Sequence, residues 1–244
     1  MLTYYGIDWT YVLLVLPAVF FALWAQFNVN RTFKKASSVS VSNGMTGAEA
    51  ARMILDRNGL YAVRIERVSG ELTDHYYPKA NVIRLSESVY DEPTPSAVGV
   101  AAHEAGHAVQ YAQNYAPIKI RTAIINVTNI GSKLSMPMII GGILLMSITS
   151  LAALYDLFYY IALAGVFCYG LCVIFQLVTL PTEFNASRRA VAAIEGTGLL
   201  TVEEQKGARK VLRAAALTYV AALATTLAQF LRLLLLVSGN RRRD

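Results

Sequence analysis

Long apolar blocks dominate this chain and limit the folds that it can adopt. Residues 134–154 and 157–180 are each long enough to cross a bilayer core of about 30 Å, and residues 10–25 and 214–237 are further candidates. Charged residues make up only 16% of the chain, well below the roughly 25% usual in soluble proteins. We therefore expect a mainly α-helical integral membrane protein with three or four transmembrane helices.

The N-terminal segment, residues 1–27, is expected to be the first of these helices, with aromatic residues near both of its ends. Asp8 precedes the apolar block and no Lys or Arg does, so a cleaved signal peptide is not expected. Positive charges follow the block at Arg31, Lys34 and Lys35. By the positive-inside rule, the segment after this helix then lies in the cytoplasm.

Residues 28–133 are expected to form a small soluble α/β insert of zincin-like type. Thr46 can cap a helix over Gly47–Arg57, which would end at the Asn-Gly pair that follows. Two runs rich in β-favouring residues, Tyr61–Val68 and Asn81–Leu85, predict a short hairpin or a small sheet.

A second helix of the insert is predicted over residues 95–113, with Thr94 as its cap and proline at its first position. It contains His103, Glu104 and His107 in an H-E-x-x-H pattern. A spacing of four places both imidazoles on one helix face, where they can share a zinc ion. The glutamate can then take a proton from zinc-bound water and pass it to the leaving amine. The alternative is a pair of ordinary histidines on a buried helix.

A catalytic zinc commonly has three protein ligands, so one more ligand must come from elsewhere in the chain. The candidates are His75 and carboxylates on another helix, of which Glu183 is preferred. Two predicted membrane crossings separate it from His107, and two crossings return the chain to the same face. The helical segment 181–213, which begins with a proline, would carry this ligand. Glu183 could instead pair with Arg188 or interact with the N-terminus of its helix.

The two central blocks are expected to form a transmembrane hairpin over residues 134–180, with Tyr155 and Asp156 as its turn. Residues 214–244 are expected to form a C-terminal hydrophobic helix and a basic tail. Arg232 interrupts this block, so the helix could cross the membrane or lie at its interface. Crossing is favoured, although it would place the basic tail outside, against the positive-inside rule.

Two signatures carry a resemblance to a known family: His-Glu-Ala-Gly-His-Ala-Val-Gln at 103–110 and Pro-Thr-Glu-Phe-Asn-Ala-Ser-Arg-Arg-Ala at 181–190. With them the chain resembles the YugP-like neutral zinc metallopeptidases, and the segments 72–78, 82–86 and 216–222 are similar as well. The resemblance implies a membrane-bound enzyme of gluzincin type, with His103, His107 and Glu183 as zinc ligands. It also implies a polypeptide substrate at or near the lipid bilayer of a bacterial or archaeal cell.

The layout is also similar to that of the membrane heat-shock and CAAX-prenyl proteases, whose third ligand often lies in an E-x-x-x-D pattern. Ser187 stands where that aspartate would be, which puts the role of the aspartate in doubt. Donors for the oxyanion remain open among His75, Tyr76, Tyr77, Arg188 and Arg189. The run 81–85 could offer an edge strand to a substrate, or be an ordinary structural strand.

Other classes of protein fit the sequence less well. A di-metal carboxylate protein needs a second E-x-x-H pair, which the chain lacks. The net charge of +6 comes from basic residues beside the apolar blocks, so lipid is the expected partner and nucleic acid is not. We therefore expect a membrane zinc endopeptidase with its active site facing the cytoplasm, with a role in membrane protein quality control. A non-catalytic zinc-binding membrane scaffold is the alternative.

Overall fold

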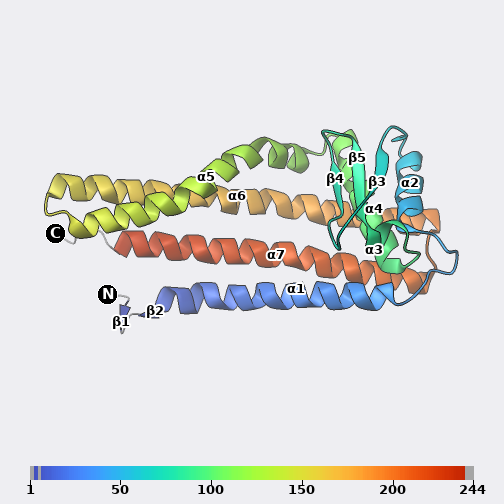
Figure 1. Cartoon of the computed structure of the whole chain (residues 1–244), viewed down its shortest axis with the longest axis horizontal. Coiled ribbons are helices and arrows are strands. Elements are labelled where there is room, and N and C mark those ends of the chain that lie inside the picture. Colours follow the sequence, from blue (N-terminus) through green and yellow to red (C-terminus); the bar gives the residue numbers. More distant parts are fainter. Residues whose placement is uncertain (1–2, 5–6, 240–244) are drawn as a thin grey trace. The chain divides into compact units, whose positions relative to one another are not determined.

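The computed structural model describes residues 3–4 and 7–239, and the arginines expected in the C-terminal tail lie outside these residues. Helices dominate this part of the chain (Figure 1). The helical elements are η1 (Tyr11–Val15, a π-helical turn), α1 (Leu16–Ser37), α2 (Gly47–Arg57), α3 (Glu87–Tyr90), α4 (Pro95–Ala112), α5 (Ala116–Ile148), α6 (Ala152–Thr197) and α7 (Val202–Gly239). The strands are β1 (Thr3–Tyr4), β2 (Ile7–Asp8), β3 (Arg64–Val68), β4 (His75–Tyr77) and β5 (Val82–Ser86).

Four helices among the described residues are long and apolar enough to cross a membrane. They span Tyr11–Ser37, Ala116–Ile148, Ala152–Thr197 and Val202–Gly239. The C-terminal apolar block forms a single helix despite the charge of Arg232 within it. The expectation of a mainly helical membrane protein with three or four such helices is therefore confirmed, at the higher number.

The turn between α5 and α6 lies at residues 149–151, so the predicted turn at Tyr155 and Asp156 was wrong. Hydroxyl groups at the end of α5 bond to the backbone around them. Ser147 donates to the carbonyl of Leu144, and Thr149 accepts from the N–H of Leu151. Such local bonds compete with the helical pattern, whereas a tyrosine or an aspartate can continue a helix.

Helix α6 continues through Pro181 without a break, so the prediction that a new helix begins there was wrong. A proline removes one backbone donor and often ends a helix. Here the residues that follow it, Thr182 and Glu183, are buried, and this packing keeps α6 helical beyond the proline. Helices α1 and α5 likewise extend into the range 28–133 that was expected to be the soluble insert.

One compact unit of the chain contains most of α5 and α6, the second half of α7 and the start of α1, and its helices approach each other at small residues. A Cβ atom on Gly142 of α5 would lie 2.7 Å from the carbonyl oxygen of Phe158 on α6. Close backbone approach of this kind is typical of membrane helix pairs. In the same unit, the carboxylate of Asp8 accepts hydrogen bonds from the guanidinium of Arg232, with Nε at 2.7 Å. This contact joins the segment before α1 to α7.

The second unit consists of residues 24–119 and 181–219 and contains a three-stranded sheet in the order β3-β5-β4. Strands β3 and β5 pair in parallel, and β4 pairs with β5 in the antiparallel direction. The expectation of a small sheet is confirmed, but the two predicted runs do not form a hairpin with each other. Strand β4 was missed because its three residues are too few to show alternation.

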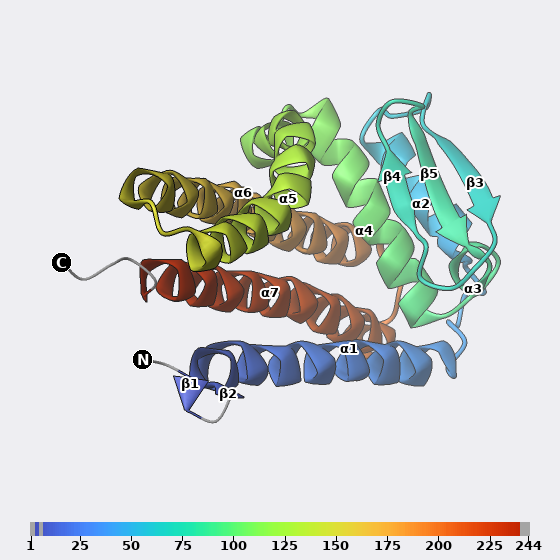
Figure 2. The same cartoon turned by 60° about the vertical axis from the view of Figure 1, so that its left-hand side comes forward.

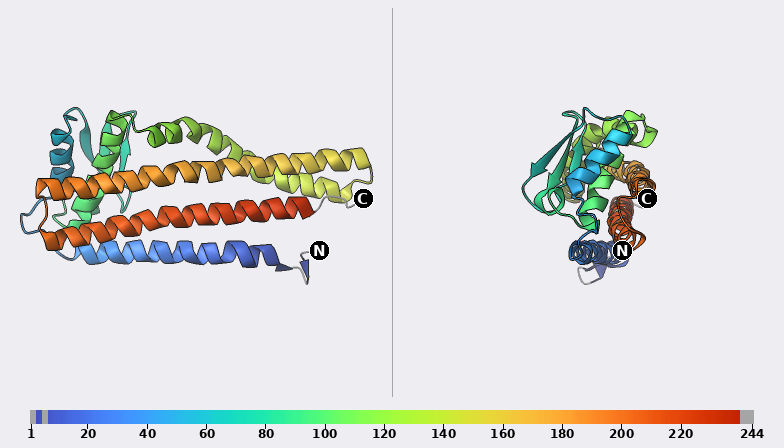
Figure 3. Two further views of the ribbon diagram at one scale, coloured as in Figure 1. Left: turned by 180° about the vertical axis from the view of Figure 1, so that it is seen from behind. Right: turned by 90° about the vertical axis from the view of Figure 1, so that its right-hand side faces the viewer.

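Helices α2 and α4 cover one face of this sheet (Figures 2 and 3). Both begin as the sequence predicts. Thr46 forms a capping box with Glu49 at the start of α2, and the Thr94 hydroxyl accepts from the N–H of Ala97 at the start of α4. Most residues of α4 are buried, and most of these buried residues are small. This helix carries the H-E-x-x-H pattern into the interior of the unit.

Candidate metal centre

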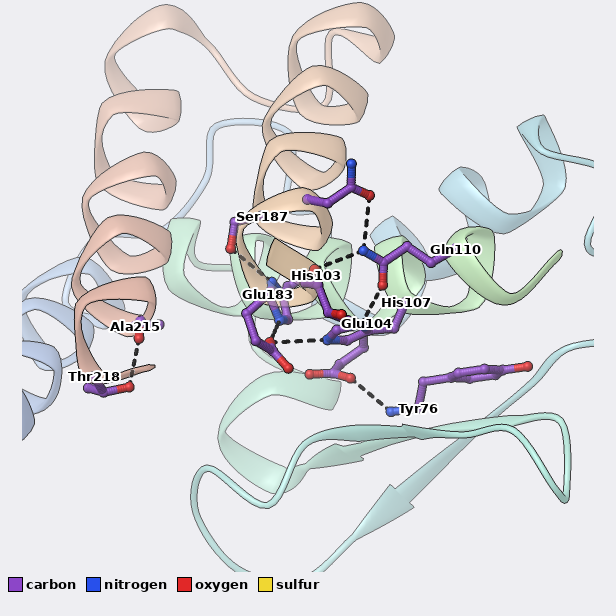
Figure 4. A network of polar contacts seen from close by, with 11 residues as sticks. Tyr76, His103, Glu104, His107, Gln110, Glu183, Ser187, Ala215 and Thr218 are labelled. Atoms are coloured by element: carbon purple, nitrogen blue, oxygen red, sulfur yellow. Dashed lines mark hydrogen bonds and ion pairs between the residues drawn. The ribbon is translucent and has the colours of Figure 1, made fainter. Parts of the chain in front are cut away.

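Two histidines of α4 point toward one carboxylate of α6 (Figure 4). His103 and His107 lie one helical turn apart on the same face, with their ring centroids separated by 4.7 Å. The Nε2 atom of His103 lies 3.2 Å from Oε2 of Glu183, and Nε2 of His107 lies 3.4 Å from the same oxygen. The structure thus brings together the three residues that the sequence suggests as ligands.

Helices α4 and α6 come close because small residues line their contact. A Cβ atom at Gly106 would lie 2.8 Å from the carbonyl oxygen of Ala186, which only glycine allows without a shift of the backbone. Ala105 on α4 and Ala190 on α6 are also fully buried. This close approach carries Glu183, itself 2% exposed, up to the two imidazoles.

The three side chains form a donor set that suits zinc. Nitrogen and oxygen ligands lie about 2.0–2.1 Å from zinc, so tetrahedral geometry separates any two of them by about 3.3 Å. The nitrogen–oxygen distances of 3.2 and 3.4 Å agree with this separation. The ligand atoms of all three residues lie within 4.8 Å of one another. Three protein donors leave the fourth direction to water or substrate, as in catalytic zinc sites.

Gln110 determines which nitrogen of His107 can face a metal. Its amide nitrogen donates to the carbonyl of Thr182 at 2.8 Å and to Oδ1 of Asn185 at 3.0 Å. Both partners are acceptors, so Oε1 of Gln110 must be the atom that faces Nδ1 of His107, at 2.9 Å. Nδ1 then carries a proton and donates it to Gln110, which leaves Nε2 as the nitrogen that faces Glu183 and could bind a metal.

Ser187 has the corresponding position beside His103. Its hydroxyl lies 3.2 Å from Nδ1 of His103. The other ring nitrogen of His103, Nε2, faces Glu183. This is the residue that replaces the aspartate of the E-x-x-x-D pattern. A hydroxyl in this place can orient the ring as a carboxylate would, but without adding a negative charge to the site.

Glu104 lies beside the three candidate ligands and is buried, with 8% of its surface exposed. Its Oε2 atom accepts a hydrogen bond from the backbone N–H of Tyr76 on β4, at 2.8 Å. The edge strand of the sheet therefore fixes the orientation of this carboxylate next to the candidate metal centre (Figure 4). A carboxylate held in this way can exchange protons with a group bound at the centre.

Neighbouring groups shift the pKa of His107, which lies on α4 outside the long apolar helices. Burial would lower the pKa of His107, but its bond with Glu183 and the charge of Glu104 raise the pKa above its ordinary value. Glu104 and Glu183 thus both lie close enough to influence this imidazole.

Other residues considered from the sequence do not join the ligand group. His75 lies exposed on β4, and its Nδ1 atom contacts the carbonyl of Thr73. The Tyr76 hydroxyl donates to Asn81, so it is the backbone of Tyr76 that reaches the site. The run 81–85 forms the central strand of the sheet, so it is a structural strand and not an edge that a substrate can extend.

Gln110 is the functional residue that sequence reasoning missed. It is completely buried and contacts both a candidate ligand and α6. The signal was available in its position three residues after His107, which places both side chains on neighbouring parts of the helix surface. A buried glutamine beside a ligand histidine is better explained as a partner of that histidine than as a packing residue.

Fold and site together define a helical membrane protein with a His-His-Glu candidate zinc centre. The chain matches the family described as "Putative neutral zinc metallopeptidase" over residues 11–238, and it belongs to this family. It is 43% identical over 231 residues to the "Putative membrane protease YugP" of Bacillus subtilis (strain 168), covering 95% of this chain and 98% of that protein. No solved structure matches the chain significantly.

Proposed function

We propose that this chain is a membrane zinc endopeptidase of gluzincin type, in which His103, His107 and Glu183 hold the metal and Glu104 is the general base. The observation that carries the proposal is the position of a buried, oriented carboxylate beside three zinc donors. A purely structural zinc site is usually closed by four protein ligands and has no need of a base.

When bound, zinc supplies Lewis acidity that polarises the scissile carbonyl and stabilises the developing oxyanion. Glu104 takes a proton from the attacking water while the oxygen of this water bonds to the carbonyl carbon. The same carboxylate then gives this proton to the amide nitrogen as the C–N bond breaks, so that a carboxylic acid and an amine leave the site. The N–H of Tyr76 keeps Glu104 turned toward the reacting atoms throughout.

The position of β4 supports an extended peptide as the substrate. This strand is at the edge of the sheet, and the N–H of Tyr76 points away from β5 toward Glu104. The free edge of β4 is therefore the edge beside the candidate centre. A peptide that adds to such an edge is bound through hydrogen bonds of its backbone, so peptides of many different sequences can bind. This suits an endopeptidase that acts on unfolded polypeptide.

The long apolar helices support substrates that are bound to the membrane or close to it. Basic residues near the end of α1, after its apolar block, favour a site that faces the cytoplasm. Breadth of substrate and membrane location together suggest protein quality control in the cell membrane. The competing function is a non-catalytic zinc-binding membrane scaffold, which would retain the ligands and have no use for Glu104.

Cleavage of an unfolded protein by the detergent-purified chain tests the proposal, with zinc content measured in the same samples. Glu104→Gln should retain zinc and lose at least about a hundredfold in kcat, whereas Glu71→Gln, an exposed residue of the insert, should match the parent. A zinc-loaded Glu104→Gln variant that cleaves as the parent does would remove this residue as the base. A zinc-loaded parent that cleaves no unfolded or membrane-anchored substrate would favour the scaffold.

A further inference from the structure

A groove between α6 and α7, which adjoins the candidate metal centre at Ser187, is lined by three arginines. Arg188 of α6 and Arg209 and Arg213 of α7 line it, and its volume is about 400 Å³. This volume falls within the range of about 300–1,000 Å³ that is common for small-ligand sites. Every residue that lines the groove belongs to the same compact unit of the chain.

The groove has positive charge that the described residues do not neutralise. Arg209 pairs with Glu195, but Arg188 and Arg213 are exposed and have no ion-pair partner within residues 7–239. No carboxylate is among the described residues that line the groove. Two free guanidinium groups at one groove are suited to an anion, because each can donate two parallel hydrogen bonds to phosphate or carboxylate oxygens.

The walls of the groove are apolar. Phe184, Leu212 and Leu217 are among them, and apart from the arginines Ser187 is the one polar side chain of the described lining. The groove therefore offers few partners for the many N–H and C=O groups of a peptide. It offers good contacts to a molecule with one anionic group and a hydrocarbon chain.

The position of the groove along both helices agrees with such a molecule. Phe184 lies four residues beyond the end of the uncharged apolar stretch 157–180 of α6. Arg213 is the last charged residue of α7 before the apolar block 214–237 begins. Each helix thus changes from polar to apolar at the groove, which is the depth at which lipid headgroups meet a membrane protein.

We propose that this groove binds an anionic phospholipid, with its phosphate between Arg188 and Arg213 and an acyl chain along Phe184 and Leu217. The site differs from the general attraction of basic residues to a membrane surface, because it requires both the paired guanidinium groups and the apolar wall. Binding can be measured with zinc-loaded and with zinc-free protein, which separates it from metal binding at the neighbouring centre.

The test is titration of the detergent-purified protein with short-chain phosphatidylglycerol and phosphatidylcholine, followed by calorimetry. We expect phosphatidylglycerol to bind more tightly than phosphatidylcholine. Arg188→Gln combined with Arg213→Gln should weaken phosphatidylglycerol binding by about tenfold or more. The matched control, Lys34→Gln with Lys35→Gln, removes two exposed charges near the end of α1 and should bind as the parent does.

Three results would overturn the proposal. Equal loss in both double variants would indicate general surface attraction. Binding of glycerol phosphate as tight as that of phosphatidylglycerol would show that the apolar wall is not used. Tighter binding of a glutamate-rich hexapeptide than of phosphatidylglycerol would assign the groove to acidic polypeptide. Each result is independent of peptidase activity, so it does not bear on the proposed function.

Discussion

Gln110 and His107 are joined by a hydrogen bond of 2.9 Å that fixes the imidazole in one tautomer. The same glutamine donates to the carbonyl of Thr182, one residue before Glu183 on α6. A single buried side chain therefore orients one candidate ligand and holds the backbone beside another. Residues that act on a metal through its ligands in this way commonly change metal affinity by 10- to 100-fold.

Gln110→Leu should lower zinc affinity by about tenfold or more, because His107 loses its acceptor. The buried carbonyl of Thr182 also loses a donor, so stability should fall by about 1–3 kcal/mol. Competition with a chelator and thermal melting measure the two effects. Gln113→Leu is the control, because the Gln113 side chain is exposed at the end of α4 and accepts from Arg189 there. Similar zinc affinity in both variants would show that Gln110 is a packing residue.

Glu183→Gln should reduce the zinc content of the purified protein severely, because an amide oxygen is a much weaker ligand than a carboxylate. Glu195→Gln, about three turns further along α6 and exposed, should retain the metal of the parent. Zinc is measured by elemental analysis after dialysis. Full zinc content in the Glu183 variant would remove this residue from the ligand set, and a different third ligand would then be needed.

Gly106→Ala should destabilise the protein by about 1–3 kcal/mol, because the new methyl group would lie 2.8 Å from the carbonyl oxygen of Ala186. The displacement of α6 should also weaken zinc binding, since Glu183 lies one turn before Ala186. Gly196→Ala has open space around its Cβ and should melt at the temperature of the parent or slightly above it. Unchanged melting and zinc affinity in the Gly106 variant would show that the two helices do not rely on this contact.

Asp74 gives a prediction about pH. Burial raises the pKa of its carboxyl above the ordinary value of 3.8, hydrogen bonds from Ser86 oppose this, and the charge of Glu104 adds to it. The stabilisation from protonated Asp74 is complete below pH 3.8 and is lost as pH rises through the raised pKa. Ionised Asp74 therefore costs stability at pH 7.

Asp74→Asn keeps an oxygen that can accept from Ser86 and removes this charge. Its melting temperature should exceed that of the parent at pH 7, and the gain should shrink as the pH is lowered to 5. Asp91→Asn, an exposed carboxylate, serves as the control and should show no such dependence on pH. If the gain in melting temperature of Asp74→Asn instead grew toward low pH, the pKa of Asp74 could not be raised in the folded protein.

Local sequence patterns predict those features of this molecule that depend on residues close to one another in the sequence. The helical spacing of His103 and His107 is enough to place both imidazoles on one face. The caps at Thr46 and Thr94 likewise mark where α2 and α4 begin. Glu183 could be proposed as a ligand because chain topology limits which segments can meet.

Features that depend on contacts between distant segments could not be predicted in the same way. The role of Gln110 depends on which face of α4 meets α6, and the continuation of α6 through Pro181 depends on the packing beyond it. The pairing of β3 with β5 and the ion pair between Asp8 and Arg232 join segments far apart in the sequence. Hydropathy and periodicity describe one segment at a time and carry no information about such partners.

The split of the proposed ligands between α4 and α6 also has a consequence for biosynthesis. Ribosomes add about 5–20 residues per second, so roughly 4 to 15 s pass between the synthesis of His107 and that of Glu183. Both central apolar blocks are made in this interval, and the nascent chain has only two of its three metal donors. The enzyme that we propose is therefore inert while it is being inserted, and it gains the ability to cut polypeptide only when most of its own chain has left the ribosome.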